Sequence, residues 1–275
     1  MKCLTMTNNK TILIKESFEY IDIGSGDVVL LIHGWLDSKE DWEFNINELA
    51  DKFRVITFDL PGCNGVKDIC RTDLEGYLEF INSFVEALAL KKFAIVGHSL
   101  GATIALEYSL RHKENVNKIG FLGLILTPTS RLKIQLSKLI LKLSAFKIFL
   151  NLVEKLKKSK KYMNYILKIT ADPHLSNYEK SAKITMKGLI NGTSTAYING
   201  YSSILTLNSI KSLRELDLLN IPYLLMYGKN DEIVSIKLVT DLDFIEKKLY
   251  LFSDSKHCPN RQKPKEFNQK VLDFL

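Results

Sequence analysis

A serine stands between two glycines in the stretch AIVGHSLGATIALEYSL, residues 94–110. The stretch opens as an apolar run and closes with the pattern of an amphipathic helix, so Gly97, Ser99 and Gly101 lie where a strand becomes a helix. The G-x-S-x-G spacing is typical of a sharp turn that strains the serine backbone and admits only very small residues two positions before and after it. Because the following helix points its N-terminal N–H groups at charge forming beside Ser99, we predict a nucleophile here.

A serine hydroxyl is a weak nucleophile, and it needs a base that is itself oriented by an acid. Asp231 comes three residues after the strand-like run IPYLLMYG, and His257 follows the run KKLYLFSDS. Ligands of an open parallel sheet bind beyond the carboxyl ends of its strands, so we expect Ser99, Asp231 and His257 to meet there. Glu232 is the neighbouring alternative for the acid that orients the base. In that case Asp231 would serve only to form a turn.

The elements that must position these residues alternate along the chain. Strand-like apolar runs cover 28–34, 54–62, 93–99, 119–126, 221–228 and 247–255, and segments of helical length such as 72–90 and 100–112 lie between them. This alternation predicts an α/β fold with a mostly parallel twisted sheet and helices on both faces. The earlier run TILIKESFEYIDIGSG has a period of two and predicts one or two antiparallel strands at the sheet edge.

The alternation stops between Thr127 and about Leu219, where the periodicity is helical and no run predicts a strand convincingly. We interpret residues 128–219 as a helical cap inserted between two strands, with TPTS as the exit and LLNIP as the return. Residues 1–127 and 220–275 then form the core. At 275 residues, the chain is long enough to bury such a core as one large domain with an insertion.

The net charge of +7 is concentrated in one part of the predicted cap. Residues 131–168 hold eleven basic residues and one acid, Glu154, a net charge of +10 that leaves about −3 for the remainder. Leu, Ile and Phe interleave with these lysines, so one helix face can be apolar and another basic. The apolar face could cover Ser99, and the basic face is either solvated or weakly associated with an anionic membrane. Since no nucleic-acid module accompanies the charge, we expect no nucleic-acid binding.

The remaining composition predicts a cytoplasmic protein without a structural metal. The first ten residues lack the apolar segment of a secretory signal, and no run of about 18 apolar residues could span a bilayer. The four cysteines show no C-x-x-C spacing, which favours free thiols over a disulfide or zinc framework. The sequence does not predict the oligomeric state.

Taken together, the motifs resemble the α/β-hydrolase family over nearly the whole chain apart from the cap. The matching segments are LLIHGW, FDLPG, VGHSLGA, YGKNDEIV and the stretch that begins at His257. The resemblance implies that Ser99 is the nucleophile, His257 the general base and Asp231 its partner. It also implies an oxyanion hole formed by the backbone N–H groups of Trp35 and Leu100.

Other motif residues have supporting roles by the same resemblance. His33 and Gly34 shape the oxyanion loop, Gly97 and Gly101 allow the turn at the serine, and His98 lines or supports that turn. Two departures stand out. The family often has a D-x-x-G-x-G-x-S pattern, which here reads DLPGCNGVKD, and the residue before the base is Lys256 where glycine is usual.

The implied reaction is hydrolysis of carboxylic esters with small or medium acyl chains through an acyl-enzyme, or of lipid esters if the cap meets a membrane. This reaction needs no cofactor. Two alternatives stay open. One is C–C bond hydrolysis of a diketone-like substrate by the same triad, and the other is a ligand-binding homologue without catalysis. A serine nucleophile disfavours epoxide hydrolase and haloalkane dehalogenase chemistry, which in this family proceeds through an aspartyl ester.

Overall fold

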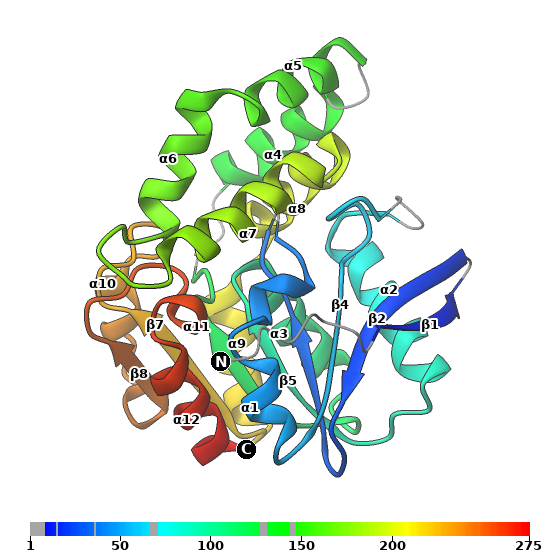
Figure 1. The fold of residues 1–275 in the computed structure, drawn as a ribbon, viewed down its shortest axis with the longest axis vertical. Coiled ribbons are helices and arrows are strands. Elements are labelled where there is room, and N and C mark those ends of the chain that lie inside the picture. Colours follow the sequence, from blue (N-terminus) through cyan, green and yellow to red (C-terminus); the bar gives the residue numbers. More distant parts are fainter. Residues whose placement is uncertain (1–8, 15, 36, 67–70, 127–130, 144–146) are drawn as a thin grey trace.

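A computed structural model describes residues 9–14, 16–35, 37–66, 71–126, 131–143 and 147–275 of the chain. The described residues form one eight-stranded sheet in the order β1-β2-β4-β3-β5-β6-β7-β8 (Figure 1). The strands are β1 (Asn9–Ile14), β2 (Glu16–Ile23), β3 (Val28–Ile32), β4 (Arg54–Phe58), β5 (Phe93–His98), β6 (Val116–Leu122), β7 (Tyr223–Gly228) and β8 (Leu249–Phe252).

The sheet is parallel from β4 to β8, and β1 and β2 join its edge as antiparallel strands. The predicted α/β fold with a mostly parallel sheet is therefore confirmed. Helices account for most of the rest: η1 (Lys39–Trp42), α1 (Ile46–Ala50), α2 (Leu74–Ala87), α3 (Leu100–Arg111), α4 (Arg131–Leu143), α5 (Lys147–Lys157), α6 (Lys160–Thr170), α7 (Tyr178–Asn191), α8 (Ser194–Thr206), α9 (Ser209–Leu218), α10 (Ile236–Thr240), η2 (Glu246–Lys248), α11 (Pro259–Gln262) and α12 (Pro264–Phe274).

The central strands are buried on both faces, which explains why they read as continuous apolar runs. Leu30 and Ile32 of β3 belong to a core shared with helices α2, α3 and α9. Val29 and Leu31 point to the opposite face and pack in a core with α1 and α12. Because neighbouring strand residues point to opposite faces, each central strand supplies both cores.

Strand β6 lies earlier in the chain than the sequence predicts, at 116–122 and not at 119–126. Gly123 has φ +61°, which turns the chain out of the sheet directly after Leu122. Leu124 and Leu126 are buried without being part of a strand, so their apolar character made the predicted strand too long. The carbonyl of Leu122 instead accepts the backbone N–H of Ser99 at 2.8 Å, which ties the end of β6 to the turn at the serine.

Six helices, α4 to α9, separate β6 from β7 in the described part of the chain. We refer to α4–α8 as the cap helices, because they stand over one end of the sheet (Figure 1). Helix α9 instead packs on core helix α3. The predicted exit at TPTS falls on residues 127–130, outside the described residues, and the division into 1–127, 128–219 and 220–275 stays a prediction.

None of the described helices combines the length and the apolar character needed to cross a bilayer. The two described cysteines, Cys63 and Cys258, are buried, and Cys3 and Cys70 lie outside the described residues.

Candidate active site

Ser99 lies on the sharp turn between β5 and α3, in a backbone conformation that serine rarely adopts. Its φ of 53° and ψ of −111° lie outside the common regions for residues with a side chain. Such strain costs about 1 to 3 kcal/mol and persists only where the surrounding structure enforces it. Here the enforcement comes from the bond to Leu122 and from close packing of the turn against β3.

The two glycines around the serine are required by that packing. A Cβ atom on Gly97 would lie 2.3 Å from the carbonyl oxygen of Gly101. A Cβ atom on Gly101 would lie 2.2 Å from the carbonyl oxygen of Ile32 and 2.5 Å from that of His33. No side chain fits at either position, so the backbone approach predicted from the G-x-S-x-G spacing has its physical cause in these contacts.

Asp231 and His257 meet at the carboxyl ends of β7 and β8. The Nδ1 atom of His257 lies 2.8 Å from Oδ2 of Asp231. The other carboxylate oxygen accepts the backbone N–H groups of Ile233 and Val234 at 2.7 and 3.0 Å. Burial raises the pKa of Asp231, but His257 and the two N–H donors outweigh it, so the pKa lies below its usual value. The carboxylate is therefore charged and fixed beside the imidazole.

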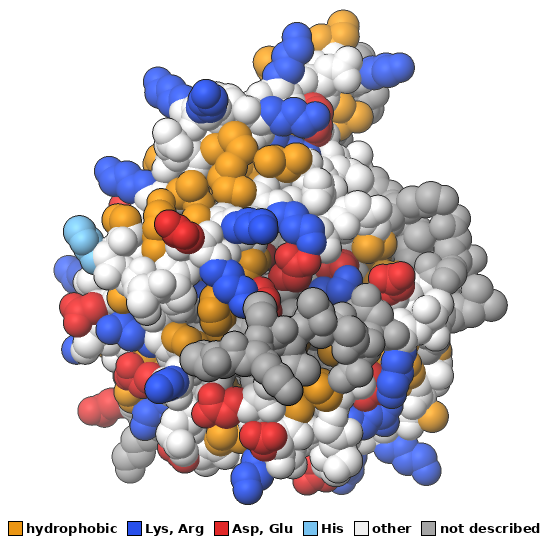
Figure 2. Space-filling view, viewed as in Figure 1, with side chains coloured by type: hydrophobic (Ala, Val, Ile, Leu, Met, Phe, Trp, Pro, Cys, Tyr) orange, Lys and Arg blue, Asp and Glu red, His pale blue; other side chains and the backbone are white. Residues whose placement is uncertain are grey.

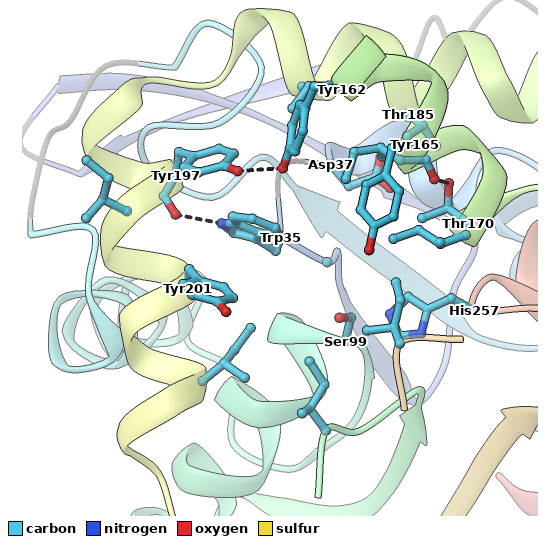
Figure 3. A pocket seen from close by; sticks show the side chains of 18 of the residues that line it. Trp35, Asp37, Ser99, Tyr162, Tyr165, Thr170, Thr185, Tyr197, Tyr201 and His257 are labelled. Carbon is cyan, nitrogen blue, oxygen red and sulfur yellow. Dashed lines mark hydrogen bonds between the residues drawn. The ribbon is translucent and has the colours of Figure 1, made fainter. Parts of the chain in front are cut away.

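Ser99 and His257 line the same cavity, which has a volume of about 750 Å³. Both residues are more than nine-tenths buried, and Figure 3 shows them beside each other on the core side of the cavity. Glu232, the alternative acid, instead pairs with Lys256 at 3.1 Å. The three predicted residues therefore lie at one site: His257 is bonded to Asp231 and lines one cavity with Ser99.

The loop after β3 lies against the serine turn. A Cβ atom on Gly34 would be 3.4 Å from the Cβ atom of Ser99, so the backbone of Gly34 lies beside the Ser99 side chain. Leu100, the second predicted oxyanion donor, is the first residue of α3. The indole N–H of Trp35 donates to the carbonyl of Tyr197 on α8 at 2.9 Å. Trp35 therefore connects this loop to the cap helices.

His33 is buried, and its hydrogen bonds hold the loop. The backbone N–H of Leu60 donates to His33 Nε2 at 2.8 Å, so the ring proton is on Nδ1, which donates to the carbonyl of Gly34 at 2.8 Å. The ring bridges the ends of β3 and β4 in its neutral form.

His98 makes a different set of hydrogen bonds. Its Nδ1 lies 2.7 Å from Oδ2 of Asp41 and its Nε2 lies 3.2 Å from the backbone oxygen of His257. Both partners can only accept, so both ring nitrogens carry a proton and the ring is a cation. Burial lowers the pKa of His98, but Asp41 outweighs it and the pKa lies well above its usual value.

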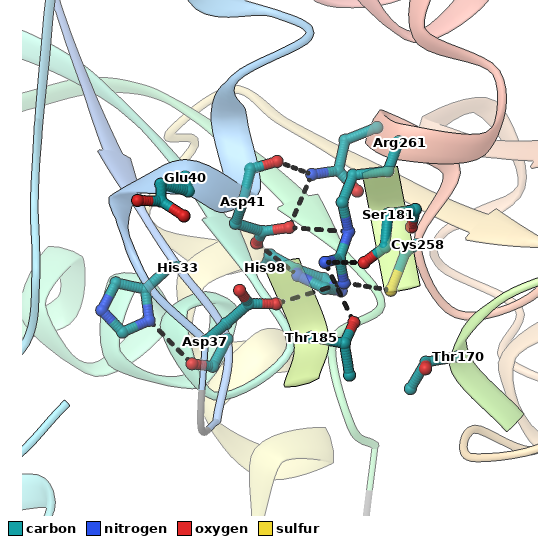
Figure 4. A network of polar contacts seen from close by, with 12 residues as sticks. His33, Asp37, Glu40, Asp41, His98, Thr170, Ser181, Thr185, Cys258 and Arg261 are labelled. Atoms are coloured by element: carbon teal, nitrogen blue, oxygen red, sulfur yellow. Dashed lines mark hydrogen bonds and ion pairs between the residues drawn. The ribbon is translucent and has the colours of Figure 1, made fainter. Parts of the chain in front are cut away.

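Arg261 completes a buried polar network that the sequence did not reveal (Figure 4). Its guanidinium lies 3.1 Å from Asp37 and 3.3 Å from Asp41, and it donates to Thr185 of α7 at 3.1 Å. It also donates to the sulfur of Cys258, the residue next to His257, at 3.0 Å. Burial raises the pKa of Asp37. No spacing rule links these residues, although Asp37 and Asp41 follow the His33-Gly34 pair and Arg261 lies four positions after His257.

Asp37, Asp41 and His98 present ligand atoms within 4.8 Å of one another, which is close enough to hold a metal ion. The guanidinium of Arg261, however, already lies against both carboxylates. The positive charge that two buried carboxylates require is therefore supplied by a side chain of the protein itself.

The two departures from the family pattern have structural counterparts. Asp59 accepts the backbone N–H of Lys39 at 2.7 Å, and the loop after it reaches the cap through a bond from the N–H of Gly65 to the carbonyl of Asn191 at 3.1 Å. Lys256 is held by a bond from its N–H to Gln262 Oε1 at 2.7 Å. Residues 67–70 of the first loop lie outside the described residues.

The walls of the cavity are mainly apolar, and both the core and the cap helices contribute to them. Trp35, Ile125 and Ile233 belong to the core, and the cap helices supply the larger share. Cap residues on the wall include Ile140, Phe149, Leu152, Val153, Leu156, Tyr162, Tyr165, Ile166, Leu189, Tyr197 and Tyr201. The hydroxyl groups of Tyr162 and Tyr197 are hydrogen bonded to each other. An apolar ligand placed here would lie between the cap and Ser99.

Comparison with known proteins agrees with this arrangement. Epoxide hydrolase 3 of Xenopus tropicalis is 23% identical over 285 residues, covering 94% of this chain and 74% of that protein. A thermophilic esterase from Thermogutta terrifontis has a TM-score of 0.76 at 18% identity, covering 96% of this chain and 97% of its own. An epoxide hydrolase from Bacillus megaterium has a TM-score of 0.70 at 22% identity, covering 96% and 99%. At such identities the structural likeness shows the fold alone.

A family model described as alpha/beta hydrolase fold matches residues 27–264, which include every element of the site described above. The chain is therefore a hydrolase that belongs to the alpha/beta hydrolase fold family.

Proposed function

We propose that this hydrolase cleaves carboxylic esters through an acyl-enzyme on Ser99, with His257 as general base and Asp231 as its orienting acid. One observation carries the proposal. A strained serine and a histidine that is bonded to a buried carboxylate line one apolar cavity. That combination is the requirement for activating a hydroxyl group in a water-poor site.

The first half of the reaction follows from the hydrogen bonds. His257 donates Nδ1–H to Asp231, which leaves Nε2 to accept the proton of Ser99. As the serine oxygen attacks the acyl carbonyl, negative charge develops on the carbonyl oxygen. The N–H groups of Trp35 and Leu100 are the proposed donors to it, and one such donor is worth about 3 to 4 kcal/mol. The charged Asp231 stabilises the imidazolium ion that forms.

The second half returns the enzyme to its starting state. His257 passes its proton to the leaving alcohol, and the ester bond between alcohol and acyl group breaks. A water molecule then gives a proton to His257 and attacks the acyl-enzyme. Collapse of that intermediate releases the acid and restores the serine hydroxyl. This sequence needs only groups of the chain and water.

The cavity supports an ester with an apolar acyl group. Burial of each methylene contributes about 0.8 kcal/mol, so longer chains gain affinity as long as the cavity accommodates them. We therefore expect kcat/KM to rise from acetate to medium chain lengths.

Epoxide hydrolysis, suggested by the names of two relatives, is a less suitable reaction for this site. Opening an epoxide with Ser99 would leave an ether on the serine, and water activated by His257 does not hydrolyse an ether. The aspartyl ester of that chemistry needs a carboxylate at position 99. The serine at this position thus favours acyl transfer.

The test is hydrolysis of p-nitrophenyl acetate, butyrate, octanoate and palmitate by the wild type and by Ser99→Ala. Ser109→Ala is the matched control, because Ser109 is also buried on α3 but its hydroxyl donates to the carbonyl of Ala105, one turn earlier in the same helix. We expect turnover by the wild type and the control and none above background by Ser99→Ala. If a folded wild type cleaves none of the four esters, the ester proposal is wrong, and C–C bond hydrolysis by the same triad or a ligand-binding role without catalysis is favoured instead.

A further inference from the structure

Two cap helices leave apolar side chains exposed in a regular pattern. Ile148 and Leu152 of α5 are 85% and 62% exposed, Leu156 follows one turn later at 44%, and Tyr165 of α6 is 57% exposed. Residues 148, 152 and 156 are four positions apart and therefore form one stripe along α5. Single exposed apolar residues are common, but a stripe marks a surface that contacts something apolar. We call this stripe with Tyr165 the α5–α6 surface.

Positive charge surrounds the α5–α6 surface. Figure 2 shows hydrophobic side chains gathered over this part of the molecule with Lys and Arg side chains among and around them. The acid of this segment, Glu154, already accepts hydrogen bonds from Lys157 and Lys158. Other lysines of the two helices are exposed: Lys147, Lys155, Lys160, Lys161 and Lys168. A partner that suits this surface must therefore be both negatively charged and able to receive leucine side chains.

The same surface borders the cavity that holds Ser99. Leu152, Leu156 and Tyr165 are each more than two-fifths exposed and also line that cavity. These three residues therefore belong both to the α5–α6 surface and to the wall of the cavity. A molecule that left a layer packed on α5 and α6 would enter the cavity past these three side chains.

We propose that the α5–α6 surface docks on an anionic lipid bilayer and that the ester substrate is a lipid taken directly from it. Amphipathic helices with lysines beside an apolar stripe lie in the interface of such bilayers, and each lysine near the surface adds to the attraction. The second part of this inference rests on the proposed function, because it assumes that Ser99 attacks an ester. A nucleic acid offers the charge but does not receive the leucine stripe.

The binding test uses the full chain carrying Ser99→Ala, so that vesicles are not consumed. Vesicles of phosphatidylcholine alone are compared with vesicles of equal parts phosphatidylcholine and phosphatidylglycerol by co-sedimentation. We expect strong partitioning only to the anionic vesicles and a steep loss of partitioning with added salt. Equal partitioning to both kinds of vesicle would contradict the proposal.

Variants identify the surface that binds. Lys155→Ala lowers the partition coefficient by about fivefold, and Ile148→Ser lowers it by about tenfold. The matched controls are Leu218→Ser, at an 81% exposed residue on α9, and Lys237→Ala on α10, and we expect neither to change partitioning. If Lys155→Ala reduces binding but Ile148→Ser does not, the partner is a polyanion without an apolar layer and the lipid proposal is wrong.

Turnover by the wild type separates this inference from the proposed function. Cleavage of p-nitrophenyl esters without vesicle binding refutes the inference and leaves the ester proposal intact. Vesicle binding without cleavage of any ester refutes the ester proposal and the lipid substrate but supports the docking surface. Cleavage of a lipid ester that is accelerated by phosphatidylglycerol, with the acceleration lost in Ile148→Ser, supports both.

Discussion

Three buried histidines near Ser99 differ in what their nitrogens can do. The N–H of Leu60 donates to Nε2 of His33, so this ring is neutral. His98 faces an acceptor at each nitrogen and is a cation. His257 bonds a carboxylate at Nδ1 and keeps Nε2 for a proton from the substrate side. At the scale of single residues, hydrogen-bond partners thus assign a positioning role to two histidines and a proposed catalytic role to the third.

Removing the charge of Asp231 tests the acid of the proposed triad. In Asp231→Asn, the amide cannot hold His257 in the required tautomer, and we expect kcat to fall by about 10³- to 10⁴-fold. Steady-state hydrolysis of p-nitrophenyl butyrate provides the measurement. Glu232→Gln is the control at the neighbouring acid, and its loss should be far smaller because Glu232 pairs with Lys256. A larger loss in Glu232→Gln would transfer the role to that residue.

The charge on His98 predicts how stability depends on pH. Its pKa is raised in the folded protein, mainly by Asp41 against the effect of burial. The resulting stabilisation is fully present below the unfolded pKa of about 6.5 and is lost as pH rises through the folded value. Urea denaturation of the wild type and His98→Gln between about pH 5 and 9 should show a free-energy difference that shrinks with rising pH. A difference that stays constant across this range would show that His98 is not charged.

The turn between β5 and α3 has room for its backbone only because Gly97 and Gly101 carry no side chain. Gly101→Ala would place a Cβ atom 2.2 Å from the carbonyl of Ile32, and we expect a loss of about 3 kcal/mol in unfolding free energy, at the upper end for overpacking. Gly65→Ala is the comparison, because among the described residues a Cβ atom there meets nothing within 4 Å, and its positive φ of 81° opposes the substitution. That strain costs about 1 to 2 kcal/mol. Urea denaturation of both variants should rank Gly101→Ala as the less stable.

Helix α7 is attached to the core by the buried side chain of Arg261 and by partly exposed ion pairs. Arg261→Met leaves Asp37 and Asp41 buried without the guanidinium, and breaking such a pair costs about 3 to 5 kcal/mol. Lys187→Met removes the partly exposed pair with Glu40, and pairs near the surface contribute about 0 to 1 kcal/mol. The unfolding free energies of the two variants measure the difference. Similar losses in both would mean that the buried network does not hold α7 more firmly than the surface pair.

At the scale of the whole molecule, the cavity lies between the core and the cap helices, and a ligand bound in it would contact both. A long-chain alkyl fluorophosphonate that modifies Ser99 should raise the melting temperature, because its chain contacts the cap while its phosphorus is bonded to the core. About 1 kcal/mol of added stability raises the melting temperature of a chain of this size by roughly 2 °C. Thermal denaturation should show a larger rise with an octyl than with a methyl group and none in Ser99→Ala. Equal shifts for both groups would place the octyl chain outside the cap.

The sequence predicted the sheet and singled out the three residues of the proposed triad because each leaves a local pattern. Apolar runs and a glycine spacing are visible over a few residues, as at Gly97 and Gly101. The network around Arg261 was not visible, because its members are brought together only by folding. The apolar residues of α5 also divide in a way that periodicity does not reveal. Phe149 and Val153 line the cavity, whereas Ile148 lies outside it.

The position of Arg261 also constrains the construction of chimeras. Its guanidinium belongs to the segment that carries His257, yet Thr185 on α7 is among its acceptors. A donor cap grafted onto this core would therefore have to bring a hydroxyl or carbonyl group to the same place. Otherwise the graft would leave a buried N–H group without an acceptor, next to the residue that we assign as the base.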